Sequence, residues 1–561
     1  MADAAPEKHP ERPRSAAGTV AAGIFASRIV GFVREAVVAF FLGVGAHTDV
    51  FQAAFRAPNL LQNLLGEGTI SAAFIPVYSR MIQEGREEEA GRFAGAIFSI
   101  LLVVVSILVL LGILLARPIV SILVPGYVGD AAAVAEGTLP IDRFELIVAG
   151  VRLIFPMTGV LVLSAWALGV LNSHRRFFTP YFAPVLWNVA IIAAFFGGAY
   201  FLTGDPLRGG DTLSVSTLND LLFITFAGAL VGGVLQFGVQ LPEVTRLLRG
   251  FRLSLSLRVK GVRESIRAFG PVVAGRGVYQ ISAYLDMFLA SWLGLGALAA
   301  LRFAQMLYVL PVSLFGLSVA ASELPELSRL REAQLAAFLD RVKRSMRQTL
   351  FLVIPTTVGY IVFGVLIVGG FLQRGAFEAA DTWLVYLVLG GYSLGLVATT
   401  VSRLLQNAFF ALSDTKTPAK IAVVRVVVST AVAIPLMFWL NQFSVSGTLG
   451  IPAGDNLLYL GAVGLAAGAS VGAWAELWWL MRSLKQRLRD FTLPLHAIMR
   501  MTGLAAAASL PAALVWWASA ALPLIVTAIL VISVFAAAYL GLAAMLSFEE
   551  LGAWTGRFRR R

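Results

Sequence analysis

The chain has 561 residues, of which 58% are hydrophobic and only 14% are charged, and its mean hydropathy is +0.81. Soluble domains carry roughly 25% charged residues, so this composition excludes a water-soluble enzyme and a disordered chain and indicates an integral membrane protein. The net charge of +12 would also suit a nucleic-acid-binding protein, so the position of the basic residues matters. There is no cysteine and the histidines are scattered, so we expect neither a bound metal nor a cofactor.

Apolar segments of the length that crosses a membrane, about 20 residues, follow one another along the whole chain. We therefore expect an all-α polytopic membrane protein with fourteen transmembrane helices. Arginines lie inside the first segment, which argues against a cleaved signal peptide. The expected spans are 18–43, 50–80, 93–117, 146–171, 180–203, 215–245, 268–293, 297–325, 348–373, 382–412, 419–440, 457–481, 497–517 and 523–547.

Basic residues are distributed unevenly between these spans. Every second connecting segment is rich in Lys and Arg, and the segments between them hold only Arg117, Arg143, Arg208 and Arg374. Because cytoplasmic loops carry the excess of basic residues, this bias predicts that both termini lie in the cytoplasm and that the number of spans is even. It also explains the basic composition through contact with anionic membrane lipid, without nucleic acid.

Several arginines remain within or near the predicted spans. A central arginine costs at least about 2.5–3.5 kcal/mol, so such residues are functional candidates. The plainer alternatives are snorkelling to the headgroups and a structural ion pair. The arginines concerned are Arg28, Arg34, Arg56, Arg152, Arg276, Arg302, Arg403 and Arg425.

Polar residues gather in the first two spans. Arg28 and Glu35 are seven residues apart and share a helix face. The second span adds Arg56, Asn59, Gln62, Asn63 and Glu67, and Gly66-Glu67-Gly68 is expected to break its helix. We infer a hydrated, arginine-lined cavity suited to a diphosphate group, and hence an anionic amphiphile as substrate.

Two segments of the first half recur in the second half, about 250 residues later. Residues 72–80 resemble 321–329, and 41–46 resemble 292–297. This repeat predicts two six-helix lobes, spans 1–6 in residues 1–249 and spans 7–12 in residues 250–490, around a central cavity. Residues 491–561, with spans 13 and 14, form a two-helix C-terminal appendage outside the repeat.

The sequence contains no convincing enzyme motif. A P-loop is absent, which excludes ATP binding of that kind. The segment Gly468-Ala469-Ser470-Val471-Gly472 matches the nucleophile pattern of hydrolases, but it lies in a membrane helix, where small residues favour close helix packing. We therefore do not expect an enzyme.

The motif residues resemble a known family. Ser27-Arg28, Gly31-Phe32-Val33-Arg34-Glu35, Asp49 and the stretch from Arg56 to Pro76 are similar to the MurJ (MviN) lipid II flippases of the MOP exporter superfamily. The resemblance implies fourteen helices and a flippase for lipid II, the undecaprenyl-diphosphate-linked peptidoglycan precursor. It also implies a groove for the lipid tail in spans 13 and 14. The cavity residues that it implies are Ser27, Arg28, Arg34 and Asp49, with Glu35 beside them.

The sequence departs from the family at several positions. Gln62 and Met306 stand where the family often has arginine, and we expect Arg302 and Arg276 to replace them, with Arg56 a weaker substitute. Asp286 would fit a sodium ligand of some members, but Arg425 and Ser429 replace the expected partners. A guanidinium near Asp286 could neutralise it in place of the ion, so no sodium site is predicted.

Taken together, these residues favour a lipid II flippase that works by alternating access. The alternatives are a lipid-linked oligosaccharide flippase or a drug exporter of the same superfamily, and a non-transporting scaffold for cell-wall synthesis. A cation exporter should line its cavity with acids, and a scaffold has no reason to keep arginines near mid-membrane. Cell-wall synthesis proteins are a further possible class of partner.

Overall fold

The structure, a computed structural model, describes residues 14–313, 335–452, 454, 456–488 and 491–552. Within these residues it is all-helical, as predicted, and contains no β-strand. The helices are α1 (Arg14–Leu42), α2 (Ala46–Leu65), α3 (Glu67–Ala73), α4 (Ile75–Gln83), α5 (Glu87–Leu114), α6 (Ala116–Leu123), η1 (Pro125–Tyr127), α7 (Asp130–Ala135), α8 (Arg143–Ser173), α9 (Phe178–Thr203), η2 (Gly210–Thr212), α10 (Val215–Gly238), α11 (Leu241–Leu247), α12 (Val262–Ala290), α13 (Ala297–Pro311), α15 (Leu335–Leu372), α16 (Ala379–Ser393), α17 (Leu396–Ala411), α18 (Lys416–Leu440), α19 (Val445–Leu449), α20 (Gly461–Arg487), α21 (Leu495–Ala518) and α22 (Leu524–Met545).

Helices occupy the described part of every predicted span, but only some of them are long and apolar enough to cross a membrane. Among the described residues, eight helices are long and apolar enough to cross a membrane, or up to ten if each of two bent pairs is one span. One bent pair, 116–135, lies in a segment where no helix was expected and turns by 105°. The end of the eighth predicted span and the repeat copy 321–329 lie outside the described residues. The count of fourteen therefore stays a prediction.

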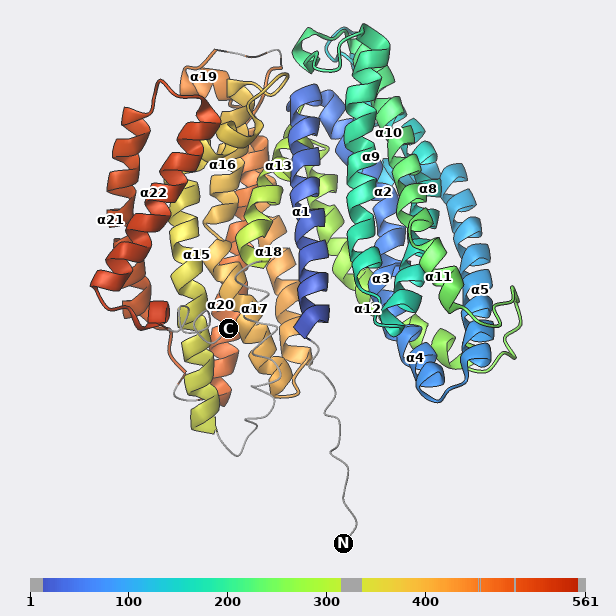
Figure 1. Cartoon of the computed structure of the whole chain (residues 1–561). Helices are drawn as coiled ribbons and strands as arrows, with labels where there is room; N and C mark the ends of the chain where they lie inside the picture. Colours follow the sequence, from blue (N-terminus) through green and yellow to red (C-terminus); the bar gives the residue numbers. More distant parts are fainter. Residues whose placement is uncertain (1–13, 314–334, 453, 455, 489–490, 553–561) are drawn as a thin grey trace.

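The helices form two packed groups (Figure 1). The N-terminal group contains α1, α2, α5, α8, α9 and α10, and the C-terminal group contains α13, α15, α16, α17, α18 and α20. Helix α12 contacts α2 and α3 as well as α13 and α20, so it bridges the groups. Helices α21 and α22 pack on α15 at one edge of the molecule. We call the end with the α1–α2 turn the upper end, and the end with the α4–α5 turn the lower end.

Small residues allow the close packing of α18 against α20. An added Cβ at Gly468 would lie 2.6–2.8 Å from Ala433, including its backbone nitrogen, and one at Gly472 would lie 2.9 Å from the Arg425 carbonyl oxygen. Without a strong hydrophobic force between helices in lipid, such close backbone approach supplies the packing energy. The interpretation of this glycine segment as a packing surface, rather than a hydrolase motif, is confirmed.

We expect Gly468→Val to lower the thermal unfolding temperature in detergent, because its side chain meets backbone atoms that cannot move aside. Overpacking of this kind costs about 1–3 kcal/mol. Gly503→Val is the matched control, since a Cβ at Gly503 of α21 would have no neighbour within 4 Å. Equal unfolding temperatures for the two variants would contradict this account of the α18–α20 contact.

The α17–α18 turn is fixed by Asp414. Its carboxylate accepts hydrogen bonds from the backbone nitrogens of Lys416 and Thr417, both at 3.0 Å, at the start of α18, and pairs with Arg487 of α20. Burial alone would raise the pKa of Asp414, but the hydrogen bonds from Thr417 and the charge of Arg487 outweigh burial and hold the pKa below its ordinary value. The ionised carboxylate therefore links the two helices.

Candidate functional site

A cavity of about 270 Å³ lies between the two helix groups. Its walls come from α1, α2, α8, α9, α12 and α13, so both groups and the bridging helix contribute. Three arginines and one carboxylate give it a surplus of positive charge. The lining residues are Arg34, Glu35, Phe51, Gln52, Phe55, Arg56, Asn59, Gln62, Asn63, Met157, Trp187, Tyr284, Arg302 and Gln305.

Glu35 is the common partner of two of the three arginines in this cavity, Arg34 and Arg302. Its side chain is buried, with 3% exposed, and Oε1 lies 2.6 Å from Nη2 of Arg34 and 3.4 Å from Nη2 of Arg302. Gln52 of α2 donates to Oε2 at 3.2 Å. Arg302 belongs to α13 of the C-terminal group, so this single carboxylate connects the two groups across the cavity. A buried charge persists only when it is paired in this way.

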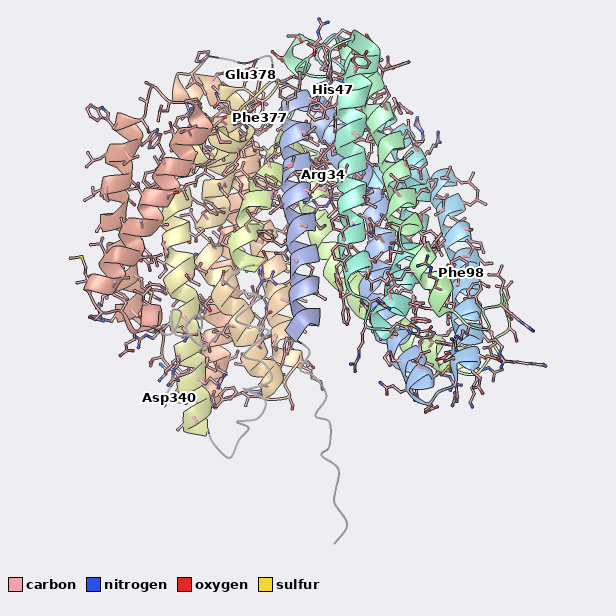
Figure 2. All side chains as sticks on the ribbon, viewed as in Figure 1. Arg34, His47, Phe98, Asp340, Phe377 and Glu378 are labelled. Carbon is pink, nitrogen blue, oxygen red and sulfur yellow. The ribbon has the colours of Figure 1, made fainter. Side chains whose placement is uncertain are left out.

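Arg34 lies on α1 in the middle of the molecule (Figure 2). Its Nη1 donates to the Asn188 side-chain oxygen at 3.0 Å, and its guanidinium lies 5.0 Å from the centre of the Trp187 ring. These contacts with α9 fix the plane of the guanidinium, and Arg34 lines the cavity. Such a preorganised planar donor suits a phosphate oxygen pair.

Arg56 forms another part of the wall, on α2. The backbone carbonyl of Arg56 accepts a hydrogen bond from the Tyr284 hydroxyl at 3.0 Å, and the guanidinium lies 5.8 Å from the centre of the same ring. Tyr284 belongs to α12, so the bridging helix positions this arginine.

A second cavity, of about 330 Å³, shares Gln62 with the first. Ser27 and Arg28 of α1 line it, together with uncharged polar residues such as Gln236 and Ser164. Nη1 of Arg28 donates to Ser313 at 3.0 Å, which connects α1 to the end of α13. The helix break expected near Gly66 is confirmed, because α2 ends at Leu65, α3 begins at Glu67 and Gly66 lines this cavity.

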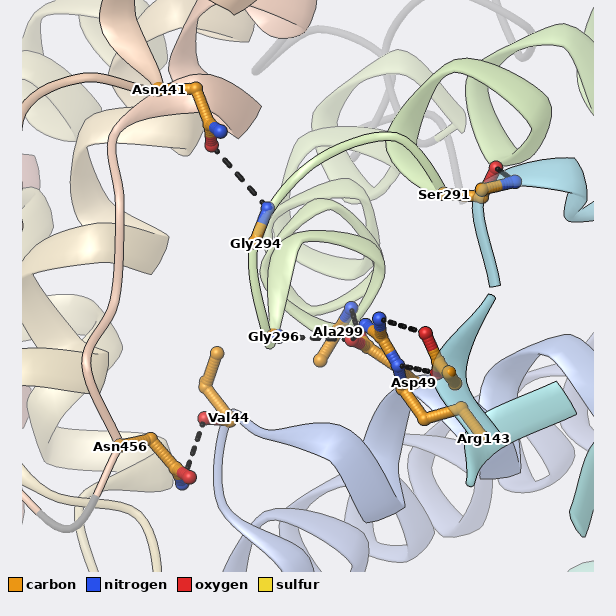
Figure 3. A network of polar contacts seen from close by, with 11 residues as sticks. Val44, Asp49, Arg143, Ser291, Gly294, Gly296, Ala299, Asn441 and Asn456 are labelled. Carbon is orange, nitrogen blue, oxygen red and sulfur yellow. Dashed lines mark hydrogen bonds and ion pairs between the residues drawn. The ribbon is translucent and has the colours of Figure 1, made fainter. Parts of the chain in front are cut away.

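The upper end is closed by hydrogen bonds between the two groups (Figure 3). The fully buried carboxylate of Asp49 accepts from the backbone nitrogens of Gly296 and Ala299, both at 2.9 Å, at the N-terminus of α13. Arg143, which is paired with Asp130 at 2.6 Å, approaches the same carboxylate at 3.5 Å. A carboxylate at a helix N-terminus satisfies backbone donors that have no partner within the helix.

A second carboxylate makes the reciprocal contact. Asp381, at the start of α16, accepts from the backbone nitrogen of Val44 in the α1–α2 turn at 3.0 Å. The turn is tight, because Gly43 has a φ of +57° and an added Cβ would lie 2.2 Å from the Ala376 carbonyl oxygen. The two groups are thus joined at the upper end by one carboxylate from each of them.

The structure brings most of the sequence-predicted residues together, but not all of them. Arg34, Glu35, Arg56, Asn59, Gln62 and Arg302 line the first cavity, and Ser27, Arg28 and Gln62 line the second. Asp49 lies apart, in the network at the upper end. The side chains of Glu67, at the start of α3, and Arg276, within α12, lie outside the described residues.

Asp286 and Arg425 belong to different contacts. Asp286 accepts a long hydrogen bond of 3.5 Å from Gln305, which also donates to the Tyr392 hydroxyl at 2.9 Å. Arg425 forms its ion pair with Glu476 of α20, at 2.7 Å. Within the part of the chain that the structure describes, no three histidine, aspartate or glutamate side chains gather closely enough to hold a metal ion.

Sequence reasoning missed the residues that orient the arginines. Gln52, Trp187, Asn188, Tyr284 and Gln305 all line the cavity or contact its arginines. The only signal for Asn188 was an amide in an otherwise apolar span, and nothing in the sequence indicated that Trp187 faces an arginine.

Comparison with known proteins agrees with this arrangement. The family model described as lipid II flippase MurJ matches residues 38–536. A probable lipid II flippase MurJ of Rhizobium tropici is 34% identical over 74% of each chain, and the lipid II flippase MurJ of Burkholderia cenocepacia is 30% identical over 79% of this chain and 82% of its own length. A solved lipid II flippase MurJ in an inward closed conformation covers 94% of this chain and 99% of its own, with a TM-score of 0.68 at 21% identity, which is a likeness of fold. The chain therefore belongs to the lipid II flippase MurJ family, a family of transporters.

Proposed function

We propose that this chain is a lipid II flippase, which moves the undecaprenyl-diphosphate-linked peptidoglycan precursor from the cytoplasmic to the outer leaflet of the bacterial inner membrane. The observation that carries the proposal is the cavity lined by Arg34, Arg56 and Arg302, from three different helices, in which the buried carboxylate of Glu35 pairs with Arg34 and Arg302. Guanidinium groups bind diphosphate oxygens through paired, charge-assisted hydrogen bonds. The positive surplus disfavours a cationic drug, because a cation would face repulsion there.

The proposed architecture has fourteen spans in three parts. Residues 1–249 and 250–490 are two six-helix lobes related by the internal repeat, and 491–561 supply the groove for the lipid tail. The two packed helix groups and the separate position of α21 and α22 on α15 support this division. The stretch Met501–Phe548 carries no charge, so it suits a lipid tail rather than a headgroup. With both termini in the cytoplasm, the upper end is external.

In the proposed mechanism, Glu35 holds the arginines until the substrate arrives. The diphosphate competes with this carboxylate for Arg34 and Arg302, while the uncharged parts of the headgroup occupy the neighbouring cavity with Gln62. The tail stays in lipid. Release to the outside requires opening of the upper network around Asp49 and Asp381, so that the lobes move around the site in alternation.

Depletion in the native bacterium tests this function. If the chain is the flippase, lipid II should accumulate in the cytoplasmic leaflet when the protein is depleted, while its synthesis continues. Normal appearance of lipid II in the outer leaflet after depletion would refute the proposal. If the protein were a non-transporting scaffold, lipid II would still reach the outer leaflet after depletion, so this measurement distinguishes a flippase from a scaffold.

We expect Arg302→Ala to lose most transport activity, because it removes the only C-terminal-group guanidinium found in contact with Glu35 among the described residues. Adding Met306→Arg to the same chain should restore activity, since residue 306 lies one helical turn away on the same face of α13. Growth of a flippase-depleted bacterium measures both. A fully active Arg302→Ala variant would show that this arginine does not hold the substrate.

A further inference from the structure

The linker between α11 and α12, residues 248–261, runs along the outside of α5 at its lower end (Figure 1). We call this segment, which is extended over residues 251–256 and turns at both ends, the strap. Its backbone lies directly on the helix: an added Cβ at Gly91 would lie 1.8 Å from the Arg249 carbonyl oxygen, and one at Gly95 would lie 2.2 Å from that of Arg252. Larger residues at these two positions of α5 would therefore displace the strap.

Further contacts fix the strap in this position. The backbone nitrogen of Ser254 donates to Ser99 Oγ at 3.0 Å. The Phe251 ring lies 6.2 Å from the rings of Phe98 and Trp166. At its two ends, Arg249 pairs with Glu87 at 2.9 Å and Lys260 with Glu89 at 3.6 Å. The strap is thus packed against the N-terminal group along its length.

The outward side of the strap is apolar. Leu253, Leu255 and Leu257 are 67%, 60% and 48% exposed, whereas Ser254 is only partly exposed and its backbone nitrogen bonds to α5. Alternation along the extended residues 251–256 places Leu253 and Leu255 on one face, and Leu257 follows in a turn that leaves it exposed. Exposure of three neighbouring leucine side chains to water would be unfavourable, so this side of the strap needs an apolar environment.

The depth of the strap points to the membrane surface. Ser99 lies six residues after Phe93, the first residue of the uncharged part of α5, which is about 9 Å along the helix. Beyond it, α5 exposes Leu102, Ile107 and Leu110. An extended backbone cannot lie in hydrocarbon without unpaired polar groups, so the strap fits the boundary where leucine side chains reach hydrocarbon and backbone groups reach water.

Basic residues flank the leucines. Arg252 and Arg258 are exposed, and among the described residues no ion pair is found for either of them. We propose that the strap is an interfacial membrane anchor, in which the leucines enter the leaflet at the lower end and Arg252 and Arg258 bind the phosphate groups of anionic phospholipids. The proposal is independent of the transported substrate. A partner protein adding a strand to the strap is the competing occupant.

The absence of cysteine from the chain permits a precise test. Single variants Leu253→Cys, Leu255→Cys, Leu257→Cys and Ser254→Cys of the full-length protein are spin-labelled in vesicles of zwitterionic and anionic phospholipid. Collision rates with oxygen, which concentrates in lipid, are compared with those of a water-soluble nickel complex. Ile107→Cys on the exposed face of α5 is the lipid control, and Gln83→Cys at the exposed end of α4 is the water control.

We expect the ratio of oxygen to nickel collision rates at the three leucine positions to be several-fold higher than at the water control. At position 254 we expect no such increase. Nickel accessibility at all three leucine positions equal to that of residue 83 would overturn the anchor and leave the protein-docking alternative.

The double substitution Arg252→Gln and Arg258→Gln should lower the oxygen preference at a Leu255→Cys label in anionic vesicles but not in purely zwitterionic ones. Equal behaviour in both vesicles would overturn the role of the arginines. Arg80→Gln, an exposed arginine of α4 paired with Glu264, is the charge control.

Discussion

An Arg34→Ala variant should fail to support growth of a flippase-depleted bacterium while its amount in the membrane stays normal. The change removes the guanidinium that bonds Glu35 at 2.6 Å and Asn188 at 3.0 Å, from a residue that lines the cavity. Two hydrogen bonds to a charged phosphate contribute together at least about 3 kcal/mol, so affinity for the diphosphate should fall on the order of 100-fold. Transport rates from vesicles containing lipid II measure the same loss directly.

One further variant tests whether the geometry of the guanidinium matters beyond its charge, and a second serves as a control. Arg34→Lys keeps the charge but cannot make the paired planar contact, so it should also be impaired. Arg117→Ala removes an exposed arginine, paired with Glu145 far from the cavity, and should grow normally. Normal growth of Arg34→Ala would remove this residue from the binding site.

Asp49→Ala should open the upper end. The substitution leaves two backbone donors of α13 without their acceptor in a fully buried position, while Arg143 keeps its ion pair with Asp130. Each buried donor left without a partner costs about 1–3 kcal/mol, and every 1.4 kcal/mol changes the ratio of two conformations about tenfold. We therefore expect a large shift toward a state whose cavity is open to the outside, with loss of transport.

Labelling from outside the cell measures this shift. Asn59→Cys in the otherwise cysteine-free chain places one thiol at the cavity wall, and a membrane-impermeant maleimide reports its external accessibility. Labelling should rise strongly when Asp49→Ala is added. Asp142→Ala is the matched control, because Asp142 caps only its own helix, α8, through the backbone nitrogen of Glu145. Unchanged labelling in the Asp49 variant would mean that this network does not close the external side.

The sequence predicted the fold best where a structural feature is determined by residues close together in the chain. The break at Gly66 followed from two glycines flanking a glutamate in a span, and the packing surface at Gly468 and Gly472 followed from small residues at helical spacing. The bent pair 116–135 was missed because neither of its short helices is long enough to give the signal of a full span.

The site was predicted less completely, because its contacts are distant in sequence. Arg302 lies at the cavity, as the one-turn spacing from Met306 suggested, although its role in binding stays a prediction. Asp49 was grouped with the cavity by resemblance, whereas its partners are backbone groups at 296 and 299 that no side-chain pattern reveals. Arg425 was considered as a charge partner for Asp286. Its charge does act on Asp286, together with that of Arg56, but its ion pair is with Glu476, a residue that the spacing along α18 could not indicate.

Reconstitution tests the central claim most directly. Purified protein is placed in vesicles that contain lipid II with a fluorescent headgroup in both leaflets, and a membrane-impermeant quencher is added outside. Vesicles with the unaltered chain should lose nearly all fluorescence, because headgroups of the inner leaflet are carried outward. Vesicles with Arg34→Ala, like protein-free vesicles, should lose only the outer half. Quenching of only the outer half by the unaltered chain, or equal and complete quenching by both chains, would contradict transport through an arginine-lined cavity.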